Sequence, residues 1–441
     1  MKKLSCILFA AVLLTACETD EVITPVVPQE DPLAEVVRIA QEGALMFEDA
    51  TTRTSVARRI DRNRISCKIN PATRAGESDD TLYYVVNYAD NAGFAIVSAN
   101  KEAPDGARLI AVTESGNYTA GEKTDNEGFN MFLQMLANSR GIIGDVEIDS
   151  LPMPELGNEV VEEYYSNWTS KGPYVQMKWG QGVRSNNVYD PQFPYNYYCY
   201  NSKTELCPAG CVAVALAQIM SYHKKPVAYN ITWNGTHATR VINWQSLCSY
   251  PGSPVGMSWS TSAIDNIAML LREIGAKAGM SYAPNGSGAT IQGARASLAG
   301  FGYAQNPEQD HNIAVIRSEL NAGRPVCEFG QGYVTDSDEN VQLAGHAWVI
   351  DGYKSRVHHY KRYMEYKGVI LAVLEETETT YNYLHINWGY DGRNNGYFLN
   401  GVFDLQQEYD YDYDIAIWND LVYDFRYGNK IVTGIVNNNS N

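Results

Sequence analysis

The sequence predicts an α+β protein in which a small α+β domain precedes a larger domain with two lobes, one helical and one built from antiparallel strands. Two observations predict this arrangement. Helical periodicity is concentrated between residues 211 and 321, whereas β-rich runs fill the chain from 324 to about 400. Residues 31–150 have a helix and a hairpin of their own, and an acidic, irregular stretch at 151–171 separates them from the rest.

The composition of the 441-residue chain is that of a globular protein, with 45% hydrophobic and 19% charged residues. Its formal net charge of -17 argues against nucleic acid as a partner, because phosphates must be neutralised by Lys and Arg. The same balance provides no basic patch that would hold the protein on an anionic membrane surface.

The N-terminal residues are typical of an export signal. Two lysines precede the apolar run 7–14, which is too short to span a bilayer as a permanent helix. The sequence Leu-Thr-Ala-Cys that ends at Cys17 is similar to a bacterial lipobox, although an ordinary signal peptide with an incidental cysteine is the alternative. We expect a lipoprotein signal peptide at 1–16 and a flexible tether at 17–30. The protein would then be exported and held in the cell envelope by a lipid anchor alone. Two placements fit this expectation: exposure on the surface of the outer membrane, or release after processing.

The first domain, residues 31–150, is expected to open with an amphipathic helix. Asp31 is its candidate N-cap, and Pro32 suits the first helical position. The domain is predicted to contain a helix over 31–50, a hairpin over 81–100 with its turn at Asp90-Asn91-Ala92-Gly93, a strand over 108–116 and a helix over 129–139.

The irregular stretch 151–171 is interpreted as an activation linker, and the larger domain is expected to cover residues 172–441. Ser262 and Asp265 form a capping-box pattern at the start of one helix, and Gly275 is its expected end. Helices are predicted over 211–224, 262–274, about 289–299 and 312–321, and strands over 324–329, 345–351, 369–376, 381–389 and 395–399.

Cys211 stands at the first turn of a predicted helix and follows Gly210. The partial positive charge of a helix N-terminus favours the thiolate and lowers the pKa of a cysteine, which is how a cysteine becomes a nucleophile. Two other readings remain open: a buried structural cysteine, or a disulfide or metal pair with Cys207. The spacing of this pair is not C-x-x-C, and no second motif completes a zinc site.

A nucleophilic cysteine needs a base that is distant in sequence and near in the fold. His346 is the leading candidate among seven histidines, because it begins an apolar run and would lie at the mouth of a strand. Asn387 ends a later strand, where its amide could orient the imidazole while Trp388 shields that hydrogen bond from water. His385 competes for the role of base, but its surroundings rank it lower.

Six cysteines remain after Cys6 and the lipobox residue are set aside. An even number in an exported protein is compatible with disulfides, but six thiols spread over the chain cannot be what holds the fold. If one of them is a nucleophile, at least one more must be free. The six are Cys67, Cys199, Cys207, Cys211, Cys248 and Cys327.

Four runs lie in order along the chain: WGQG at 179–182, GCVAVALAQIMSYH at 210–223, AGHAWVIDGY at 344–353 and HINWGYDGRNNGYF at 385–398. Together they resemble the streptopain/interpain family of papain-like cysteine peptidases, which are bacterial secreted proenzymes. The run YYVVNYADNAGFAIVSAN also resembles the propeptide of that family. The resemblance extends from about residue 80 to the low 400s and implies a two-lobed, papain-like peptidase domain behind an α+β prodomain.

The resemblance implies Cys211 as the nucleophile, His346 as its general base, and Gln181 as the oxyanion-hole amide. It places Asn387 and Trp388 around the histidine. It implies that the substrates are proteins or peptides and that neither a cofactor nor a metal is needed. It also implies a zymogen whose prodomain acts as an intramolecular inhibitor until the chain is cut between about 140 and 175.

The chain departs from the family pattern in two places. Tyr390 replaces the second tryptophan of the usual Asn-Trp-Gly-Trp-Gly-Gly run, and Cys207 is not expected so close to the nucleophile. The segment 280–290 is either part of the substrate cleft or an ordinary Gly/Ser loop. Two other functions remain open: an inactive envelope binding or adhesion lipoprotein, and a transglutaminase-type acyltransferase. The acidic run 407–414 is either a calcium site or a solvated strand.

Overall fold

A computed structural model describes most of both predicted domains. The described residues are 33–47, 58–69, 81–101, 103, 105–138, 158–182, 194–233, 236–252, 260–335, 341–403 and 429–437. The expected signal peptide, the tether, the helix start at Asp31 and Pro32, and the acidic run 407–414 lie outside them. Within the described ranges, no helix is both long and apolar enough to cross a bilayer.

The N-terminal unit places one helix on each face of an antiparallel sheet. The first helix, α1, packs Val36 and Ile39 on one face, and Phe129 of α3 packs on the other. The elements of this unit are α1 (Ala34–Ala44), η1 (Leu45–Phe47), β1 (Ile60–Ile69), β2 (Thr81–Tyr88), η2 (Ala89–Asn91), β3 (Phe94–Ser98), α2 (Asp105–Arg108), β4 (Leu109–Thr113) and α3 (Glu127–Asn138).

The predicted hairpin is confirmed by the antiparallel pairing of β2 with β3. Asp90 and Asn91 have positive φ angles of 59° and 60° at its turn, a conformation that Asp and Asn tolerate better than most residues. Gly93 has a φ of 96°, and a Cβ there would lie 2.2 Å from the Thr113 carbonyl oxygen. The turn therefore requires glycine at this position.

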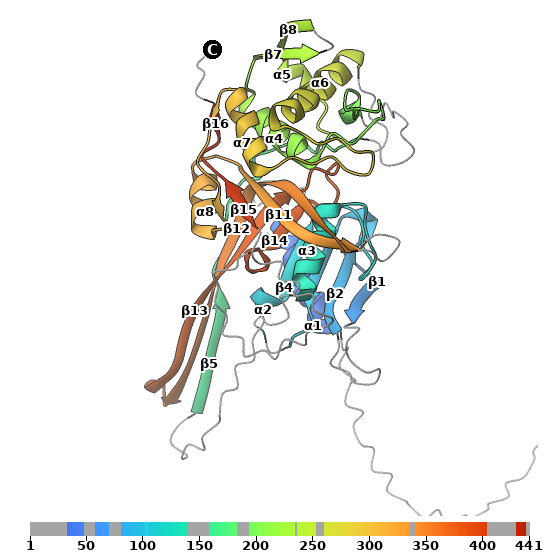
Figure 1. The fold of residues 1–441 in the computed structure, drawn as a ribbon. Helices are drawn as coiled ribbons and strands as arrows, with labels where there is room; N and C mark the ends of the chain where they lie inside the picture. Colours follow the sequence, from blue (N-terminus) through green and yellow to red (C-terminus); the bar gives the residue numbers. More distant parts are fainter. Residues whose placement is uncertain are drawn as a thin grey trace, which may run out of the picture.

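The four helices predicted for the larger domain are present, with shifted ends. The elements before the β lobe are η3 (Pro194–Asn196), α4 (Cys211–His223), β7 (Ala228–Trp233), β8 (Thr236–Val241), α5 (Trp244–Leu247), α6 (Thr261–Ala278), α7 (Ile291–Gly300), β9 (Tyr303–Ala304), β10 (Gln309–Asp310) and α8 (Ile313–Asn321). Figure 1 shows α4, α6 and α7 at one end of the molecule, above the large sheet.

Both predicted ends of α6 are wrong. Ser260, not Ser262, caps the helix, because its side chain accepts a hydrogen bond from the Ala263 N–H. The helix continues through Gly275 to Ala278 and ends at Gly279, which has the left-handed conformation typical of a helix C-terminus. A second serine two residues away made the cap ambiguous from the sequence.

One antiparallel sheet joins the N-terminal unit to the β lobe. Among the described residues its strand order is β1-β2-β3-β4-β14-β13-β12-β11-β15-β10. The junction is the pairing of β4 with β14, where residues 111–113 face 396–398. The remaining elements are β11 (Val326–Thr335), β12 (Val341–Tyr366), β13 (Val369–Asn387), β14 (Gly396–Leu399), η4 (Asn400–Val402), β15 (Lys430–Val432) and β16 (Val436–Asn437).

The stretch 151–171 is not irregular where the structure describes it. Residues Asn158–Tyr165 form β5 and Thr169–Lys171 form β6, and both strands pair with β12. The sequence did not reveal β5 because its residues are mostly exposed and three of the eight are Glu, without the apolar alternation on which strand prediction rests. Three strands, β5, β12 and β13, extend from the body as an arm (Figure 1).

The N-terminal unit shares its core with the β lobe. Phe132 of α3 packs edge-on against Phe398 of β14, with ring centres 4.8 Å apart, and also contacts Phe403. These rings belong to one buried cluster that also contains Trp348 and Trp388. The helix α3 is therefore held directly beside the segment that carries the predicted histidine and asparagine.

Candidate functional site

Cys211 is the first residue of α4, a helix that is buried from Cys211 to Ser221. The residue before it, Gly210, has a φ of 90°, and a Cβ there would lie 2.8 Å from Met280 and 3.0 Å from the Ser287 carbonyl oxygen. Glycine therefore lets the chain enter α4 in this tight space. The N-cap Gly210 has no side chain to cap the helix, and the backbone N–H groups of Cys211 and Val212 form hydrogen bonds with the Cys211 thiol.

His346 lies on β12, opposite Gly330 of β11, and is only 2% exposed. Its Nε2 is 2.9 Å from the Trp388 carbonyl oxygen, and within the described part of the chain its Nδ1 has no hydrogen-bond partner. Burial lowers the pKa of the imidazole to about 4. The imidazole is therefore neutral at pH 7 in this state.

The structure brings Cys211 next to the strand that carries His346. The backbone N–H of Ala347 donates to the Cys211 thiol, and both residues belong to the same buried cluster. Burial nevertheless raises the pKa of the thiol to about 11, and the carboxylate of Glu127 adds to the rise. The thiol is therefore protonated at neutral pH, and the pair is not in the ionised form that attacks a carbonyl.

The start of helix α3 occupies the space in front of these two side chains. A Cβ on Gly128 would lie 2.5 Å from both His346 Cδ2 and Trp388 Cε3, so the backbone of α3 sits against the imidazole and the indole. The neighbouring Glu127 forms a hydrogen bond with Tyr390, and burial raises the pKa of this carboxyl group. The N-terminal unit therefore blocks the approach of a substrate to the cysteine–histidine pair.

Two further contacts fix the start of α3 on the loop after β13. Asp125 forms an ion pair with Arg393 at 2.7 Å, and the Asn126 amide donates to the Arg393 carbonyl oxygen at 3.1 Å. The Asn126 side-chain oxygen also accepts from the Phe129 N–H, which caps α3. One residue therefore both starts the helix and anchors it to the loop.

Gln181 lies in the extended segment before η3, near the start of α4. Its backbone carbonyl accepts a hydrogen bond from the Ala209 N–H at 2.9 Å, two residues before Cys211. Its neighbour Gly182 has a φ of 100°, and a Cβ there would lie 2.2 Å from the Asn196 side chain. This contact holds the segment close to the start of α4, and the oxyanion-hole role of the Gln181 side chain stays a prediction.

Asn387 is buried at the end of β13, but its amide bonds elsewhere than to His346. Its Nδ2 donates to the Met177 carbonyl oxygen at 2.9 Å, and its Oδ1 accepts from the Gly389 N–H at 3.2 Å. Trp388 is fully buried, and its indole N–H donates to the Asn394 carbonyl oxygen. In this state the Trp388 backbone, rather than the Asn387 amide, holds the imidazole.

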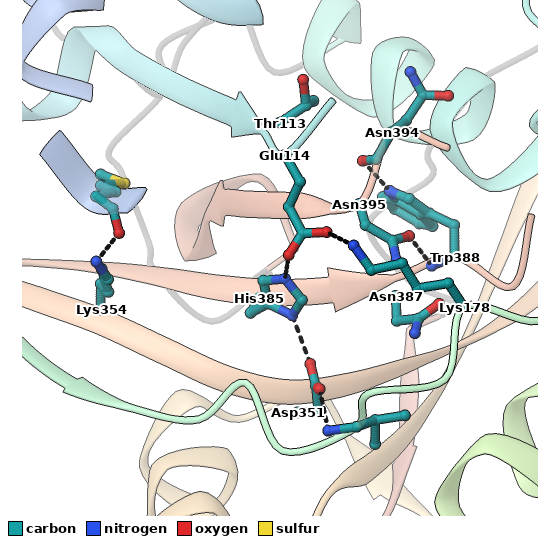
Figure 2. A network of polar contacts seen from close by, with 12 residues as sticks. Thr113, Glu114, Lys178, Asp351, Lys354, His385, Asn387, Trp388, Asn394 and Asn395 are labelled. Carbon is teal, nitrogen blue, oxygen red and sulfur yellow. Dashed lines mark hydrogen bonds and ion pairs between the residues drawn. The ribbon is translucent and has the colours of Figure 1, made fainter. Parts of the chain in front are cut away.

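His385, the competing candidate, contacts carboxylates and not the thiol (Figure 2). Its Nδ1 is 2.6 Å from Asp351 and its Nε2 is 3.1 Å from Glu114 of the N-terminal unit, which also pairs with Lys178. Burial alone would lower the pKa of His385, but Asp351 and Glu114 raise it to about 9. The protonated imidazole therefore forms ion pairs with one carboxylate of each domain and joins the two domains non-covalently.

Asp391 was not singled out by the sequence, yet its carboxyl group lies beside the Gln181 segment. A Cβ on Gly180 would lie 2.5 Å from Asp391 Oδ1, and the Tyr195 hydroxyl bonds to the same carboxyl group. Burial raises the pKa of Asp391 to about 7. Arg393 Nη2 lies 3.3 Å from Asp391 Oδ2, so one arginine contacts this carboxylate and also Asp125 of the N-terminal unit.

The six cysteines of the described chain are free, so Cys207 and Cys211 form no disulfide. The Cys207 thiol instead donates to the Glu205 carbonyl oxygen. The described ranges also contain no group of three or more His, Cys, Asp or Glu residues that could hold a metal ion.

Most of the residues that sequence reasoning missed meet across the two domains, whereas Asp391 contacts Gly180 and Tyr195 of its own domain. Glu114, Glu127, Gly128, Asp391 and Arg393 each contact a group that is distant in sequence. A signal was present only at Asp391, because an acidic residue directly after the Asn-Trp-Gly-Tyr run stands where the related pattern has glycine.

Two family matches cover most of the described chain. Residues 189–398 match the Peptidase C10 family, and residues 44–139 match the Spi protease inhibitor family. The chain is 24% identical over 369 residues to streptopain of Streptococcus pyogenes, and the match covers 76% of this chain and 78% of streptopain. It is also 24% identical over 359 residues to the thiol protease/hemagglutinin PrtT of Porphyromonas gingivalis, with 76% of this chain but only 35% of that protein covered.

Two solved structures from Prevotella intermedia are also similar. A prointerpain A fragment matches with a TM-score of 0.48 and 21% identity, covering 84% of this chain and 98% of the fragment. Active interpain A matches with a TM-score of 0.37 and 23% identity, covering 60% of this chain and 94% of that structure.

Proposed function

The chain belongs to the Peptidase C10 family of cysteine proteases and carries a Spi-type propeptide, and on this premise we propose that Cys211 and His346 hydrolyse peptide bonds once the propeptide has left. The observation that carries the proposal is the placement of the thiol beside the strand of His346, with α3 seated on both. The relatives' printed names include a thiol protease, which supports the same chemistry.

The proposed reaction proceeds through a thioester. The Cys211 thiolate attacks the scissile carbonyl carbon, and the tetrahedral oxyanion accepts hydrogen bonds from the Cys211 N–H and the Gln181 side chain. The C–N bond then breaks as His346 gives its proton to the leaving amine. Water attacks the thioester while the imidazole takes a proton from it, and the C–S bond breaks to release the acid and the thiolate.

The structure corresponds to a latent state in this proposal. The thiol with a pKa of about 11 and the imidazole with a pKa of about 4 are both neutral at pH 7. Removal of α3 would admit water and vacate the space that Gly128 occupies beside the imidazole. The ring could then turn from the Trp388 carbonyl toward the thiol. The Asn387 amide at the end of β13 is proposed to orient the ring in that active position.

Release of the propeptide is proposed to require a cut between about 140 and 175. Since β5 and β6 pair with β12, a cut before Asn158 would leave both strands with the catalytic part. The segment 139–157 is thus the preferred part of the interval. The protein itself is proposed to be exported and lipid-anchored at Cys17, with its propeptide as an intramolecular inhibitor.

One experiment tests the activity and the nucleophile together. The chain is treated with an irreversible cysteine-peptidase inhibitor before and after limited proteolysis, and the modified residue is identified by mass spectrometry. Labelling of Cys211 that rises after the cut, together with peptide hydrolysis, is expected. Labelling without hydrolysis of any peptide would favour the inactive binding protein, and transfer of the acyl group to an added amine in preference to water would favour the acyltransferase.

A further inference from the structure

The arm that extends from the body has a polar stem and an apolar tip. We define the stem as the part in which β5 pairs with residues 358–362 of β12, and the tip as the hairpin 363–373. Figure 1 shows the arm reaching past the lower end of the sheet, away from the helical lobe. Nothing in the proposed peptidase mechanism uses this projection, so the inference that follows is independent of it.

Charged groups in the stem are paired across its strands. Lys361 lies 3.3 Å from Glu376 of β13, and Arg362 lies 3.4 Å from Glu159 of β5. The two histidines of the stem face carboxylates in the same way, His358 toward Glu163. The charge of the stem is therefore largely compensated, and its exposed apolar side chains are Val161 and Tyr164 of β5.

Side chains in the tip are apolar and exposed. The exposed fractions are Tyr366 53%, Val369 61%, Ile370 49%, Leu371 53% and Val373 48%. The acidic residue nearest the turn, Glu365, accepts a hydrogen bond from the Gly368 N–H at 3.1 Å. A cluster of large apolar side chains this exposed, at the end of a projecting ribbon, marks a surface that is covered by something else.

The apolar residues occupy both faces of the ribbon. Val369 and Ile370 are neighbours in β13, and successive side chains of a strand point to opposite faces. A flat protein surface would cover one face and leave the other in water. Fluid hydrocarbon surrounds an inserted tip on every side, so a lipid bilayer covers both faces at once.

Two observations place a bilayer at this end of the molecule. Helix α1, where the described chain begins, lies at the same lower end as the arm, opposite the helical lobe (Figure 1). Residues 17–32, which precede it, can span at most roughly 55 Å when extended. An anchor at Cys17 would therefore keep the arm within reach of the same membrane.

We propose that the tip 363–373 inserts into the interfacial layer of a lipid bilayer and holds the peptidase domain at the membrane. Tyr366 and Lys367 at the turn suit the headgroup level, because an aromatic ring and a long cationic side chain are favoured there. Since β12 and β13 belong to the peptidase part, this contact persists after the propeptide and any lipid on it have been cut away.

The test uses the chain from Glu18 onward, which contains every described residue and lacks the signal peptide and the lipid. Flotation with vesicles of phosphatidylcholine, and of phosphatidylethanolamine with phosphatidylglycerol, is expected to recover the protein with both. Because the contact is apolar, recovery should survive high salt. The combined change Val369→Ser, Ile370→Ser and Leu371→Ser should lower partitioning at least about tenfold.

A matched control carries the same kind of change elsewhere. Ile69→Ser with Val241→Ser alters residues that are 59% and 73% exposed but distant from the arm, and should float like the parent chain. Cys211→Ala should also float unchanged, which separates this contact from the proposed activity. Equal flotation of tip variant and parent, or no flotation of the parent, would overturn the proposal. A tip-dependent dimer without vesicle binding would assign the tip to a second copy instead.

Discussion

His346 and His385 lie on neighbouring strands of one sheet and are almost equally buried, with 2% and 3% of their surfaces exposed, yet their pKa values move in opposite directions. Burial lowers the pKa of His346 to about 4, because its one polar partner is the neutral Trp388 carbonyl. Burial acts on His385 too, but the carboxylates of Asp351 and Glu114 outweigh it and raise its pKa to about 9.

The difference separates a histidine that is kept neutral until the domains part from a histidine whose charge holds the two domains together. His385 is permanently charged at neutral pH and forms an ion pair that joins propeptide to peptidase. His346 has no acid beside it, so its charge depends on whether the Cys211 thiol gives up its proton. The sequence ranked the two histidines by their surroundings, but it could not show the two carboxylates that contact His385 in the fold.

The largest expected effect follows from removing the reactive pair. Cys211→Ala and His346→Ala should each lower peptidase activity of the cut protein by at least about 10³-fold. His346→Ala should also lose rapid thiol alkylation at mildly acidic pH, since the imidazolium stabilises the thiolate. His385→Gln is the matched control and should retain activity per folded molecule. If His385→Gln loses alkylation and His346→Ala keeps it, the two roles are reversed.

Gly128→Ala should weaken inhibition by the propeptide by about tenfold or more. The added Cβ would lie 2.5 Å from His346 Cδ2, and overpacking of this kind typically costs about 1–3 kcal/mol. Alanine favours the helix more than glycine does, so an impaired α3 would not explain the loss. The measurement is the dissociation rate of the cut propeptide. Adding His346→Ala should restore part of the binding, because the added Cβ would also lie 2.5 Å from Trp388 Cε3. No recovery at all would show that the imidazole is not what the added methyl group meets.

The two histidines should give opposite slopes to stability against pH. His385 has its pKa raised above the unfolded value, so its contribution is complete below about pH 6.5 and is lost as pH rises through about 9. His346 has its pKa lowered, so stability falls as pH drops from about 6.5 toward 4. Thermal unfolding between pH 4 and 10 should show the alkaline slope in the parent chain. The acidic slope should show in Asp391→Asn, because Asp391 contributes the opposite slope between about pH 4 and 7. His385→Gln should flatten the alkaline one alone, and His346→Gln the acidic one alone.

Asp391→Asn should have a smaller effect, which is limited to the pH dependence of stability against unfolding. The pKa of Asp391 is raised to about 7, so the folded state binds this proton more tightly than the unfolded state, and stability is lost as pH rises from about 4 to 7. The amide cannot ionise and should remove that loss while keeping the Tyr195 contact. An unchanged unfolding temperature profile over this range would mean that Asp391 is not buried as a neutral acid.

The smallest expected effect belongs to Cys207→Ala, which should leave activity and latency unchanged. Its thiol contacts the Glu205 carbonyl oxygen and forms no disulfide. Altered kcat in this variant would assign the upstream cysteine a part in the reaction that its contacts do not suggest.

Local patterns were enough to predict the longer helices and the β2–β3 hairpin, because each is encoded by neighbouring residues such as the Asp90-Asn91-Ala92-Gly93 turn. The short helices α2 and α5 and the β7–β8 hairpin were not predicted. Local patterns failed where partners are distant. The strand β5 is specified by its pairing with β12 and not by its own acidic residues, and the Ser260 cap depends on which of two serines reaches Ala263. Motif order led to Cys211, His346 and Gln181, but the Glu114 and Gly128 contacts arise only when the propeptide folds onto the β lobe.

The backbone pairing of β4 with β14 has a consequence for the timing of activation. Residues 111–113 and 396–398 are bonded as inner strands of one sheet, so a cut in the linker breaks a covalent bond but leaves this ladder and the phenylalanine core in place. When the propeptide departs, β14 becomes an edge strand whose N–H and C=O groups must be taken up by water. In the proposed activation, scission and onset of activity would therefore be separate events, and the half-life of the nicked complex, not the cutting rate, would set the delay between them.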